Sequence, residues 1–415
     1  MKRRSAATRR TAAPLRLTDA QRIVGVRALR GFADGLVSVL LAGYLVDLGF
    51  TPFEVGAIVT GTLLGSAVLT IALGLRAHRY QRRPLLLVAC GLMVLTGVGF
   101  AALTGFWPLL LVALIGTLNP SAGDVSIFLP TEQAALANTT SAERRTHLFA
   151  RYNVAGNLAG ALGALASGGP ALVARAAGID LLSAERVGFA VYAAIAAISG
   201  VVYLGLGRSI ESPVAAATPL ERSRPIVLRL AALFSLDSFG GGFAVQSLLV
   251  LWLDQRFGLS VEVAAGVFFA AGIAGALSQL LSPWLARRIG LVETMVYTHL
   301  PANLFLIGAG LAPSAAVAVT LLLLRAALSQ MDVPARQAYV MAVVPPDERP
   351  AAASLTNVPR SLAAALPPLF VGLMLSHSAV GWPLVCGGAL KIAYDLLLLA
   401  RFRAVPPRPI EATAR

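Results

Sequence analysis

Apolar stretches of about 20 residues recur along the chain, and this recurrence constrains the fold more than any other feature of the sequence. Such a stretch is the length that an α-helix needs to cross roughly 30 Å of hydrocarbon. Of the 415 residues, 57% are hydrophobic and only 13% are charged, which does not fit a soluble protein of two or three domains. Leu, Ala and Gly dominate without period-2 alternation, so the sequence predicts an all-α, multi-pass membrane protein.

We predict twelve spanning helices, six in each half of the chain. They cover residues 27–48, 53–76, 85–106, 108–136, 147–174, 187–207, 227–254, 260–286, 291–311, 314–343, 350–376 and 381–402. The segment between the halves has no long apolar run and contains several Pro and charged residues, which is typical of a linker. The predicted organisation is a basic tail at 1–26, a six-helix half at 27–207, a linker at 208–226, a second six-helix half at 227–403 and a tail at 404–415.

Lys and Arg are distributed unevenly between the two sides of this predicted bundle. The N-terminal tail, the loop after the second helix and the C-terminal end carry most of them, whereas the opposite side has only Arg175, Arg186 and Arg256. By the positive-inside rule both termini and the linker are predicted to be cytoplasmic. The formal charge of +14 then reflects this asymmetry and attraction for anionic lipids rather than nucleic-acid binding. Arg in place of nearly all Lys, with heavy use of Ala, indicates a GC-rich genome and therefore a bacterial plasma membrane.

The two halves repeat one another within the membrane. The stretch that begins at Pro130 recurs at Pro334, and the stretch that begins at Asn153 recurs at Asn357, each at a spacing of 204 residues. Duplicated halves packed about an axis are how many transporters form a central site. We therefore expect aligned residues of the two halves to contribute to one site between them.

The loop after the second predicted helix has a distinctive basic sequence. From Gly74 to Arg83 it reads Gly-Leu-Arg-Ala-His-Arg-Tyr-Gln-Arg-Arg. With twelve helices in two similar halves, this loop resembles the signature of the major facilitator superfamily, and the resemblance covers nearly the whole chain. In that family the loop holds the cytoplasmic side shut. The resemblance implies a cytoplasmic gate made of Gly74, His78, Arg79, Arg82 and Arg83, with Glu132 or Glu143 as an acid that Arg79 could bind.

One position of this loop departs from the family pattern. The family has an Asp where this chain has His78, so the salt bridge that the Asp makes in the family is not expected here. His78 is either a pH-sensitive part of the gate or a solvated side chain in a basic loop.

Glycines are regularly spaced on the fifth predicted helix. Gly156, Gly160 and Gly163 are separated by four and three residues, which resembles the Gly-rich fifth helix of drug and proton antiporters of the same family. Small residues at this spacing also allow any two membrane helices to pack closely. The sequence alone supports both interpretations.

Ionisable residues lie within several predicted helices, where each costs at least about 2.5–3.5 kcal/mol at the bilayer centre. Such side chains are expected to face a partner or a water-filled cavity rather than lipid. Arginines outnumber unpaired acids among them, which favours an anionic or zwitterionic solute. The residues predicted to line a substrate pocket are Arg30, Asp237, Arg325, Asp332, Arg336, Asn153, Asn157, Asn357 and Arg360.

Two acids are candidates to carry a proton. An Asp beside an Arg stays ionised, whereas a desolvated Asp without a nearby cation can bind protons near neutral pH. Asp124 has no basic neighbour on its own helix and is the first candidate. Asp34 is the second, because proton-coupled members of the family often place an acid on the first helix. Asn119 and Pro120 predict a bend in the fourth helix close to Asp124.

Two more polar pairs are predicted to have structural roles. Lys391 and Asp395 are four residues apart on the twelfth helix, which favours an ion pair. His299 and Asn303 share a face of the ninth helix, where we expect a hydrogen-bonded pair.

These features predict a secondary transporter that moves a small organic solute by alternating access, with proton-coupled efflux as the leading interpretation. The alternatives are an importer or facilitative carrier, and a transceptor or lipid-handling protein that keeps the fold without pumping. The chain contains no metal-ligand pair or catalytic motif, so we expect no enzymatic activity, cofactor or metal. The expected partners are the solute, protons and membrane lipids, and the protein is expected to be a monomer.

Overall fold

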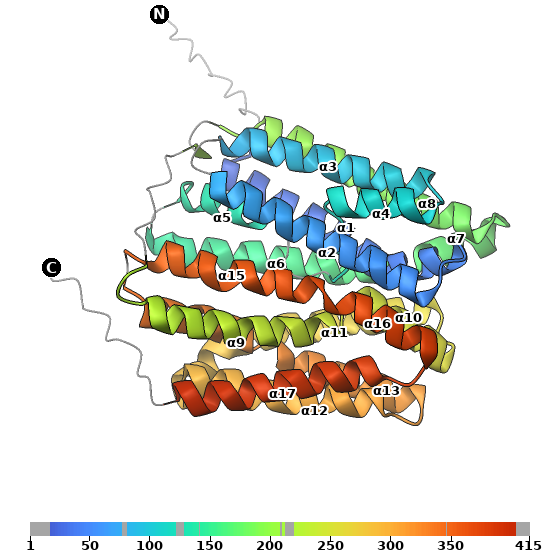
Figure 1. Ribbon diagram of the computed structural model, residues 1–415. Coiled ribbons are helices and arrows are strands. Elements are labelled where there is room, and N and C mark those ends of the chain that lie inside the picture. Colours follow the sequence, from blue (N-terminus) through green and yellow to red (C-terminus); the bar gives the residue numbers. More distant parts are fainter. Residues whose placement is uncertain are drawn as a thin grey trace, which may run out of the picture.

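The computed structural model of this chain is a bundle of helices. It describes residues 17–76, 81–121, 128–140, 142–207, 210–211, 220–345 and 347–403, and within these ranges every long element is an α-helix (Figure 1). The described chain begins at the left end of the bundle in Figure 1 and also ends there. We call this end the termini end and the opposite one the far end.

The helices fall into two groups in chain order, which occupy the upper and lower parts of Figure 1. The N-terminal half contains α1 (Asp19–Asp47), α2 (Pro52–Arg76), α3 (Arg82–Ala102), α4 (Phe106–Ile115), α5 (Phe128–Ala137), α6 (Ala142–Ala166), α7 (Gly169–Ala177) and α8 (Leu181–Leu204). The C-terminal half contains α9 (Arg224–Gly242), α10 (Gln246–Phe257), α11 (Val261–Ile289), α12 (Leu291–Gly310), α13 (Ala315–Ser329), α14 (Asp332–Val343), α15 (Arg349–Ala365), α16 (Pro367–His377) and α17 (Trp382–Phe402).

Ten segments of the described chain are long and apolar enough to span a membrane. The other two predicted spans correspond to α12 and to the pair α4–α5. Five predicted spans are not single helices: 108–136 is divided between α4 and α5, 147–174 between α6 and α7, 227–254 between α9 and α10, 314–343 between α13 and α14, and 350–376 between α15 and α16. The predicted bend at Asn119 and Pro120 lies in the interruption between α4 and α5.

Local sequence explains several helix ends. Thr18 and Gln21 form a capping box at the start of α1, in which each side chain accepts a backbone hydrogen bond from the other residue. Gly178 and Gly258 end α7 and α10 in the left-handed conformation that glycine adopts without strain. The interruption after α9 follows three consecutive glycines that end at Gly242.

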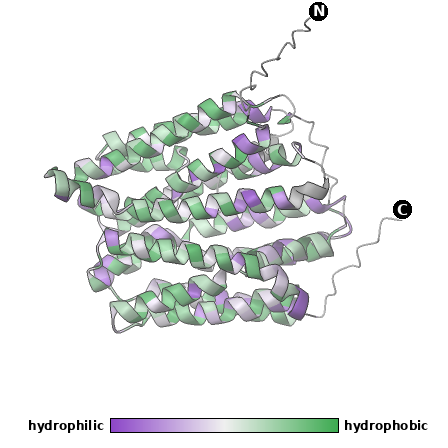
Figure 2. Ribbon diagram, turned by 180° about the vertical axis from the view of Figure 1, so that it is seen from behind, coloured by the Kyte–Doolittle hydropathy of each residue, from purple (hydrophilic) through white to green (hydrophobic). Residues whose placement is uncertain are grey.

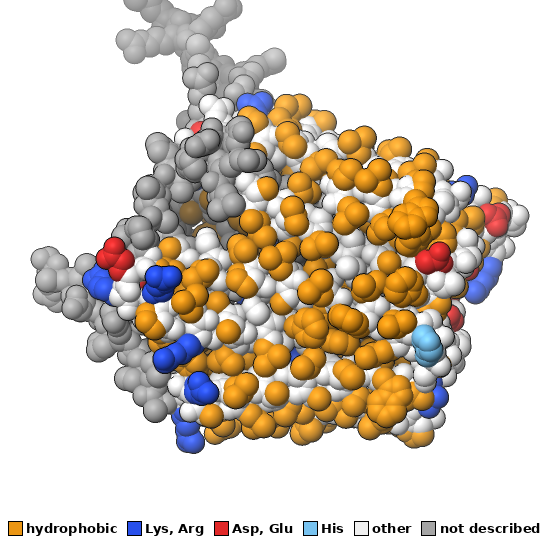
Figure 3. Space-filling view, in the orientation of Figure 1, with side chains coloured by type: hydrophobic (Ala, Val, Ile, Leu, Met, Phe, Trp, Pro, Cys, Tyr) orange, Lys and Arg blue, Asp and Glu red, His pale blue; other side chains and the backbone are white. Residues whose placement is uncertain are grey.

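The outer surface of the bundle is apolar. Figure 3 shows hydrophobic side chains over most of the face in view, with Lys and Arg gathered at the termini end, and Figure 2 shows hydrophobic residues along the helices seen from behind. Many large apolar side chains are exposed, among them Trp107, Val201 and Leu280. This distribution is typical of a surface that contacts lipid, with basic residues at one boundary.

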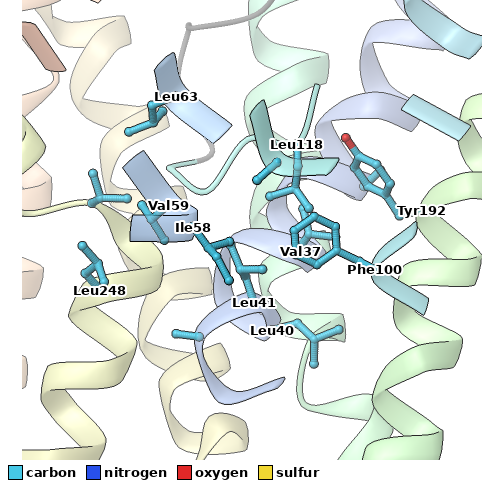
Figure 4. Close-up of a cluster of buried hydrophobic side chains, with 14 of the residues drawn as sticks. Val37, Leu40, Leu41, Ile58, Val59, Leu63, Phe100, Leu118, Tyr192 and Leu248 are labelled. Atoms are coloured by element: carbon cyan, nitrogen blue, oxygen red, sulfur yellow. The ribbon is translucent and has the colours of Figure 1, made fainter. Parts of the chain in front are cut away.

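The two halves contact each other most closely away from the termini end. Backbone atoms of Gly56 on α2 and Gly372 on α16 lie so close that a β-carbon built on Gly56 would be 2.9 Å from the α-carbon of Gly372. Arg175 on α7 forms an ion pair of 2.7 Å with Glu262 on α11. The apolar cluster in Figure 4 also crosses the boundary, since Leu248 of α10 belongs to the same cluster as α1 and α2 residues.

Glycines allow α1 and α6 to pack with their backbones in contact. A β-carbon added to Gly35 would lie 2.0 Å from the carbonyl oxygen of Gly160, and one added to Gly163 would lie 1.9 Å from that of Phe32. Gly31 meets Gly156 in the same way, at 2.4 Å. The glycine spacing on α6 therefore serves helix packing, which is the second of the two interpretations given above.

Loops at the termini end are held by two carboxylates. Glu211 of the linker accepts hydrogen bonds from the backbone N–H groups of Arg82 and Arg83 at the start of α3, at 2.6 and 2.8 Å. Glu348, just before α15, accepts from the backbone N–H groups of Arg222 and Ser223 at 3.0 Å each, and from the Ser223 hydroxyl. The linker is thus fixed to both halves by the residues that are described.

Replacing Gly35 by Ala should destabilise the protein, because a β-carbon there overlaps the α6 backbone. Overpacking of this kind costs about 1–3 kcal/mol. The matched control is Gly25→Ala on the same helix, where nothing lies within 4 Å of the added carbon. Thermal unfolding in detergent should give a lower midpoint for Gly35→Ala and an unchanged or higher one for Gly25→Ala. Equal midpoints for the two variants would contradict the close α1–α6 contact.

The hydrogen bonds that Glu348 accepts should make the stability of the protein depend on pH in the acidic range. Hydrogen bonds from the Ser223 hydroxyl and from backbone N–H groups lower the pKa of Glu348 from 4.5 to about 2. A lowered folded-state pKa means that the stabilisation is complete above the ordinary pKa and is lost as pH falls toward about 2. Glu348→Gln should therefore lower the unfolding midpoint at neutral pH, and its difference from wild type should shrink across that window. Asp347→Asn, next to it and exposed, should show little difference at any pH.

Candidate functional site

A buried ion pair lies at the centre of the N-terminal half. The guanidinium of Arg30 on α1 is 2.8 Å from a carboxylate oxygen of Glu132 on α5, and the side chains are 1% and 0% exposed. The hydroxyls of Tyr152 on α6 and Tyr203 on α8 both donate to this carboxylate. The Arg30 guanidinium also stacks on the ring of Phe128, 3.7 Å from its centroid. Glu132 therefore joins four helices through one carboxylate.

A second buried ion cluster lies in the C-terminal half. One carboxylate oxygen of Asp237 on α9 is 2.5 Å from the ammonium of Lys391 on α17, and the other is 3.2 Å from the guanidinium of Arg336 on α14. Arg336 is also 2.9 Å from Asp332, one turn earlier on α14. All four side chains are less than 10% exposed, so the charges are neutralised within the protein.

Each cluster contains one arginine–carboxylate pair at equivalent positions of the repeat, but the arginine and the acid have exchanged places between the halves. Glu132 and Arg336 occupy equivalent positions in the repeat that begins at Pro130 and Pro334. Arg30 aligns with Asp237 when the Phe and Gly residues that follow each of them are matched. The N-terminal half thus has its arginine on the first helix of the half and its carboxylate on the fourth, whereas the C-terminal half has the reverse.

Histidine and asparagine from α12 extend the C-terminal cluster. Nδ1 of His299 is 2.9 Å from Asp395 of α17, and Asn303 donates to the other oxygen of Asp395 at 2.9 Å. Nε2 of His299 lies 3.8 Å from Asp237. The expected hydrogen bond between His299 and Asn303 is present, with 3.3 Å between Asn303 Nδ2 and His299 Nδ1. The prediction of an ion pair between Lys391 and Asp395 is wrong, since in the described residues Lys391 forms its ion pair with Asp237.

Of the two residues predicted to carry a proton, the structure describes only Asp34. Asp124 lies outside the described residues. Asp34 is buried on α1, 8% exposed, one turn from Arg30. Among the described residues, no hydrogen bond or ion pair within 4.0 Å reaches the Asp34 carboxylate. Arg27 is also buried on α1, stacks 5.4 Å from the ring centroid of Tyr152, and has an Nε atom without a hydrogen-bond partner in the described chain.

The remaining predicted pocket residues are spread over both halves. Arg360 of α15 donates to Ser238 of α9 at 3.0 Å and to Asn357 at 3.3 Å. Asn357 and its repeat partner Asn153 on α6 are both exposed.

Of two further pocket candidates, Asn157 lies at the boundary between the halves and Arg325 lies within the C-terminal half. Asn157 donates across the boundary to Gln279 on α11 at 3.1 Å, and Gln279 in turn donates to Gln330. Arg325 on α13 is half-buried, and its Nε atom lacks a hydrogen-bond partner within the described ranges.

The predicted gate is described only in part. His78 and Arg79 lie outside the described residues, and for Gly74 only its place in α2 is described. Arg82 and Arg83 donate from their side chains to backbone carbonyls of Ile210 and Leu204, which lie at or before the linker. The prediction that Glu132 is a gate acid is wrong, because its carboxylate is buried and is bound by Arg30 and two tyrosines.

The arrangement of twelve predicted spans in two repeated halves is shared with known proteins. A model of the Major Facilitator Superfamily matches residues 23–368. The chain belongs to this superfamily. A curated relative is the uncharacterized membrane protein YJR124C of Saccharomyces cerevisiae, 24% identical over 413 residues that cover 91% of this chain and 92% of the relative.

Solved structures of transporters share the fold. A D-xylose-proton symporter superposes with a TM-score of 0.74 at 17% identity, covering 93% of this chain and 98% of the symporter. The nucleoside transporter NupG has a TM-score of 0.69 at 15% identity and covers 92% and 99%. A bacterial homologue of the lysosomal transporter Spinster has a TM-score of 0.70 at 15% identity and covers 92% and 97%. The predicted fold of the major facilitator superfamily is confirmed.

Sequence reasoning missed the tyrosines that bind Glu132 and the link between α12 and α17. Tyr152 and Tyr203 lie in apolar helices, where tyrosine is common. The sequence does not show that the Glu132 carboxylate is buried and needs hydrogen-bond donors, so nothing in it singles out these two residues. The presence of both an acid and a histidine on facing C-terminal helices was a usable signal for Asp395 and His299, because buried acids require partners.

Breaking the C-terminal cluster should destabilise the protein strongly. Asp237→Asn leaves the buried Lys391 ammonium without its carboxylate, a change that costs about 3–5 kcal/mol when one partner of a buried pair is removed. Adding Lys391→Met removes the unpaired charge and should recover part of the loss, while Arg336 keeps Asp332 as its partner. The comparison is the thermal unfolding midpoint of the two single variants and the double variant. A double variant as unstable as the sum of the singles would show that the pair is not coupled.

Proposed function

We propose that this protein is a proton-coupled secondary transporter of a small organic solute, and that Asp34 is its proton carrier. The observation that carries the proposal is that Asp34 is buried while no hydrogen bond or ion pair within 4.0 Å reaches its carboxylate among the described residues, so that Arg30 and Arg27, one and two turns earlier on α1, do not hold it in a closed ion pair. A buried carboxylate that lacks such bonds is where a proton can be bound and released without dismantling a network. Membership in a transporter superfamily supports the same interpretation.

Proton and solute would be coupled through the two arginines of α1. An ionised Asp34 attracts Arg27 and Arg30, and protonation removes that attraction. Arg30 retains Glu132, so Arg27, whose Nε atom lacks a hydrogen-bond partner within the described chain, is the group whose environment changes most. A change in charge at this position would alter the affinity of the protein interior for an anionic group. The mechanism needs no ATP.

The solute is proposed to be anionic or zwitterionic. Arg360 and Arg325 carry positive charge in the C-terminal half, and the Arg325 Nε atom has no hydrogen-bond partner in the described ranges. Asn153 and Asn357 are exposed and equivalent in the repeat, which suits them to contact polar groups of a solute. The D-xylose-proton symporter and the nucleoside transporter NupG, which share the fold, act on small polar organic molecules.

Alternating access is proposed to operate between the halves, in a bacterial plasma membrane with both termini cytoplasmic. Export is the proposed direction. In the described chain three polar contacts join the halves, Asn157 with Gln279, Pro120 with Ser247 and Arg175 with Glu262. The contact of Arg175 on α7 lies at the far end (Figure 1), which supports a conformation closed on that side. A monomer is sufficient for this cycle, because each half supplies one side of the site.

Asp34→Asn should separate solute binding from proton coupling. A panel of anionic, zwitterionic and cationic metabolites is first screened by thermal stability, since a ligand at about 100 times its dissociation constant adds roughly 2.7 kcal/mol. Proteoliposomes then report counterflow of the stabilising solute and its accumulation under an imposed pH gradient. Asp34→Asn should keep counterflow and lose gradient-driven accumulation.

The matched control is Asp47→Asn at the exposed far end of the same helix, which should behave like wild type. For export, wild type oriented inside out should accumulate the solute when its lumen is acidic. Full gradient-driven transport by Asp34→Asn would reject Asp34 as the carrier. A solute-binding protein that shows no counterflow would favour a non-pumping transceptor.

A further inference from the structure

A basic groove lies on the C-terminal half at the termini end, away from the ion clusters of the interior. It has a volume of about 560 Å³ and lies between the start of α9, the end of α14 and the end of α17. Its polar side is formed by Arg222, Arg229 and Arg401, and its apolar side by Ile226, Ala232, Leu233, Val343, Leu397 and Phe402. We use the name basic groove for these residues.

The positive charge of the basic groove is only partly neutralised. Arg222 forms an ion pair of 2.5 Å with Asp347 and lies 3.6 Å from Glu348. Arg229 and Arg401 are exposed, and neither makes an ion pair or hydrogen bond with another described residue. Two guanidinium groups are therefore available to an anion, and guanidinium groups bind phosphate oxygens in a bidentate manner.

The apolar side of the basic groove continues onto the lipid-facing surface. Ala232 and Leu397 are exposed, while Val343 and Phe402 are buried and form the floor. Figure 3 shows basic side chains at the end of the face where α9 begins and α17 ends, next to a broad apolar surface. A site that is cationic at the membrane boundary and apolar toward the membrane centre fits a molecule that is anionic at one end and apolar along its length.

We propose that the basic groove binds an anionic phospholipid, with the headgroup phosphate between Arg229 and Arg401 and an acyl chain along Leu233 and Leu397. The volume is within the usual range of ligand pockets, and charge and hydrophobicity both match a lipid at the membrane boundary. Leu233 precedes Asp237 by one helical turn on α9, so a lipid here would also brace the segment that carries the C-terminal ion cluster.

The test compares lipid retention and stability in nanodiscs of phosphatidylcholine with and without phosphatidylglycerol. Native mass spectrometry should show phosphatidylglycerol retained at least about tenfold more than phosphatidylcholine by wild type, equivalent to about 1.4 kcal/mol. Arg229→Gln with Arg401→Gln should abolish this preference and the associated rise in thermal midpoint. The matched control is Arg287→Gln with Arg288→Gln, which removes two exposed arginines at the same end but outside the basic groove.

Two more measurements distinguish a lipid site from a site for free phosphate and from general charge attraction. Ala232→Trp fills the apolar side without changing charge and should also reduce retention, which keeps the test valid if the arginine variant folds poorly. Soluble glycerol phosphate is added to protein in phosphatidylcholine nanodiscs. Stabilisation equal to that by phosphatidylglycerol would show a site for free phosphate and would overturn the lipid proposal. Equal loss of retention in the control pair would show general charge attraction and would also overturn it.

Discussion

The rest of the structure depends on the neutralisation of charges that lie out of reach of water. A charged side chain near the bilayer centre costs at least about 2.5–3.5 kcal/mol, so each one requires a partner inside the protein. Glu132 meets this requirement for Arg30, and Asp237 meets it for both Lys391 and Arg336. These contacts join helices that are far apart in the sequence, and they therefore fix which helices can be neighbours within each half.

Close helix packing and the buried charges support one another. The glycine contacts between α1 and α6 bring the helix backbones together, and they also bring Arg27 against Gly156 and the ring of Tyr152. Tyr152 in turn donates to Glu132, the partner of Arg30. A side chain at Gly156 would displace Arg27, so the glycines that allow the contact are also required to place the cation.

The sequence predicted the spans and the fold because apolar length and repetition are local properties that lipid imposes directly. It also predicted that Arg30, Asp237 and Arg336 lie inside the protein. It did not predict their partners, because an ion pair between α9 and α17 joins residues 154 positions apart. The error at Lys391 has this cause: Asp395 is the nearest acid in sequence, but His299 and Asn303 bind it in the folded protein. Helix interruptions such as the one after Gly242 and the one before Pro367 were missed although their sequences contain glycine or proline, because the apolar length of a span does not show whether one helix or two shorter ones cover it.

The two halves are alike in topology but not in how they use their acids. In the described part of the C-terminal half, Asp237, Asp332 and Asp395 each accept an ion pair or hydrogen bond, and no buried aspartate there is left over. In the N-terminal half Glu132 is equally committed, whereas Asp34 has no such bond among the described residues. Reversing the polarity of the ion pair at these equivalent positions places the arginine of the N-terminal half on α1, next to this aspartate. The acid one turn from Arg336 on α14, Asp332, is paired with that arginine, whereas the acid one turn from Arg30 on α1, Asp34, has no ion pair among the described residues. This difference between the halves is the basis for the proposal that proton coupling involves α1.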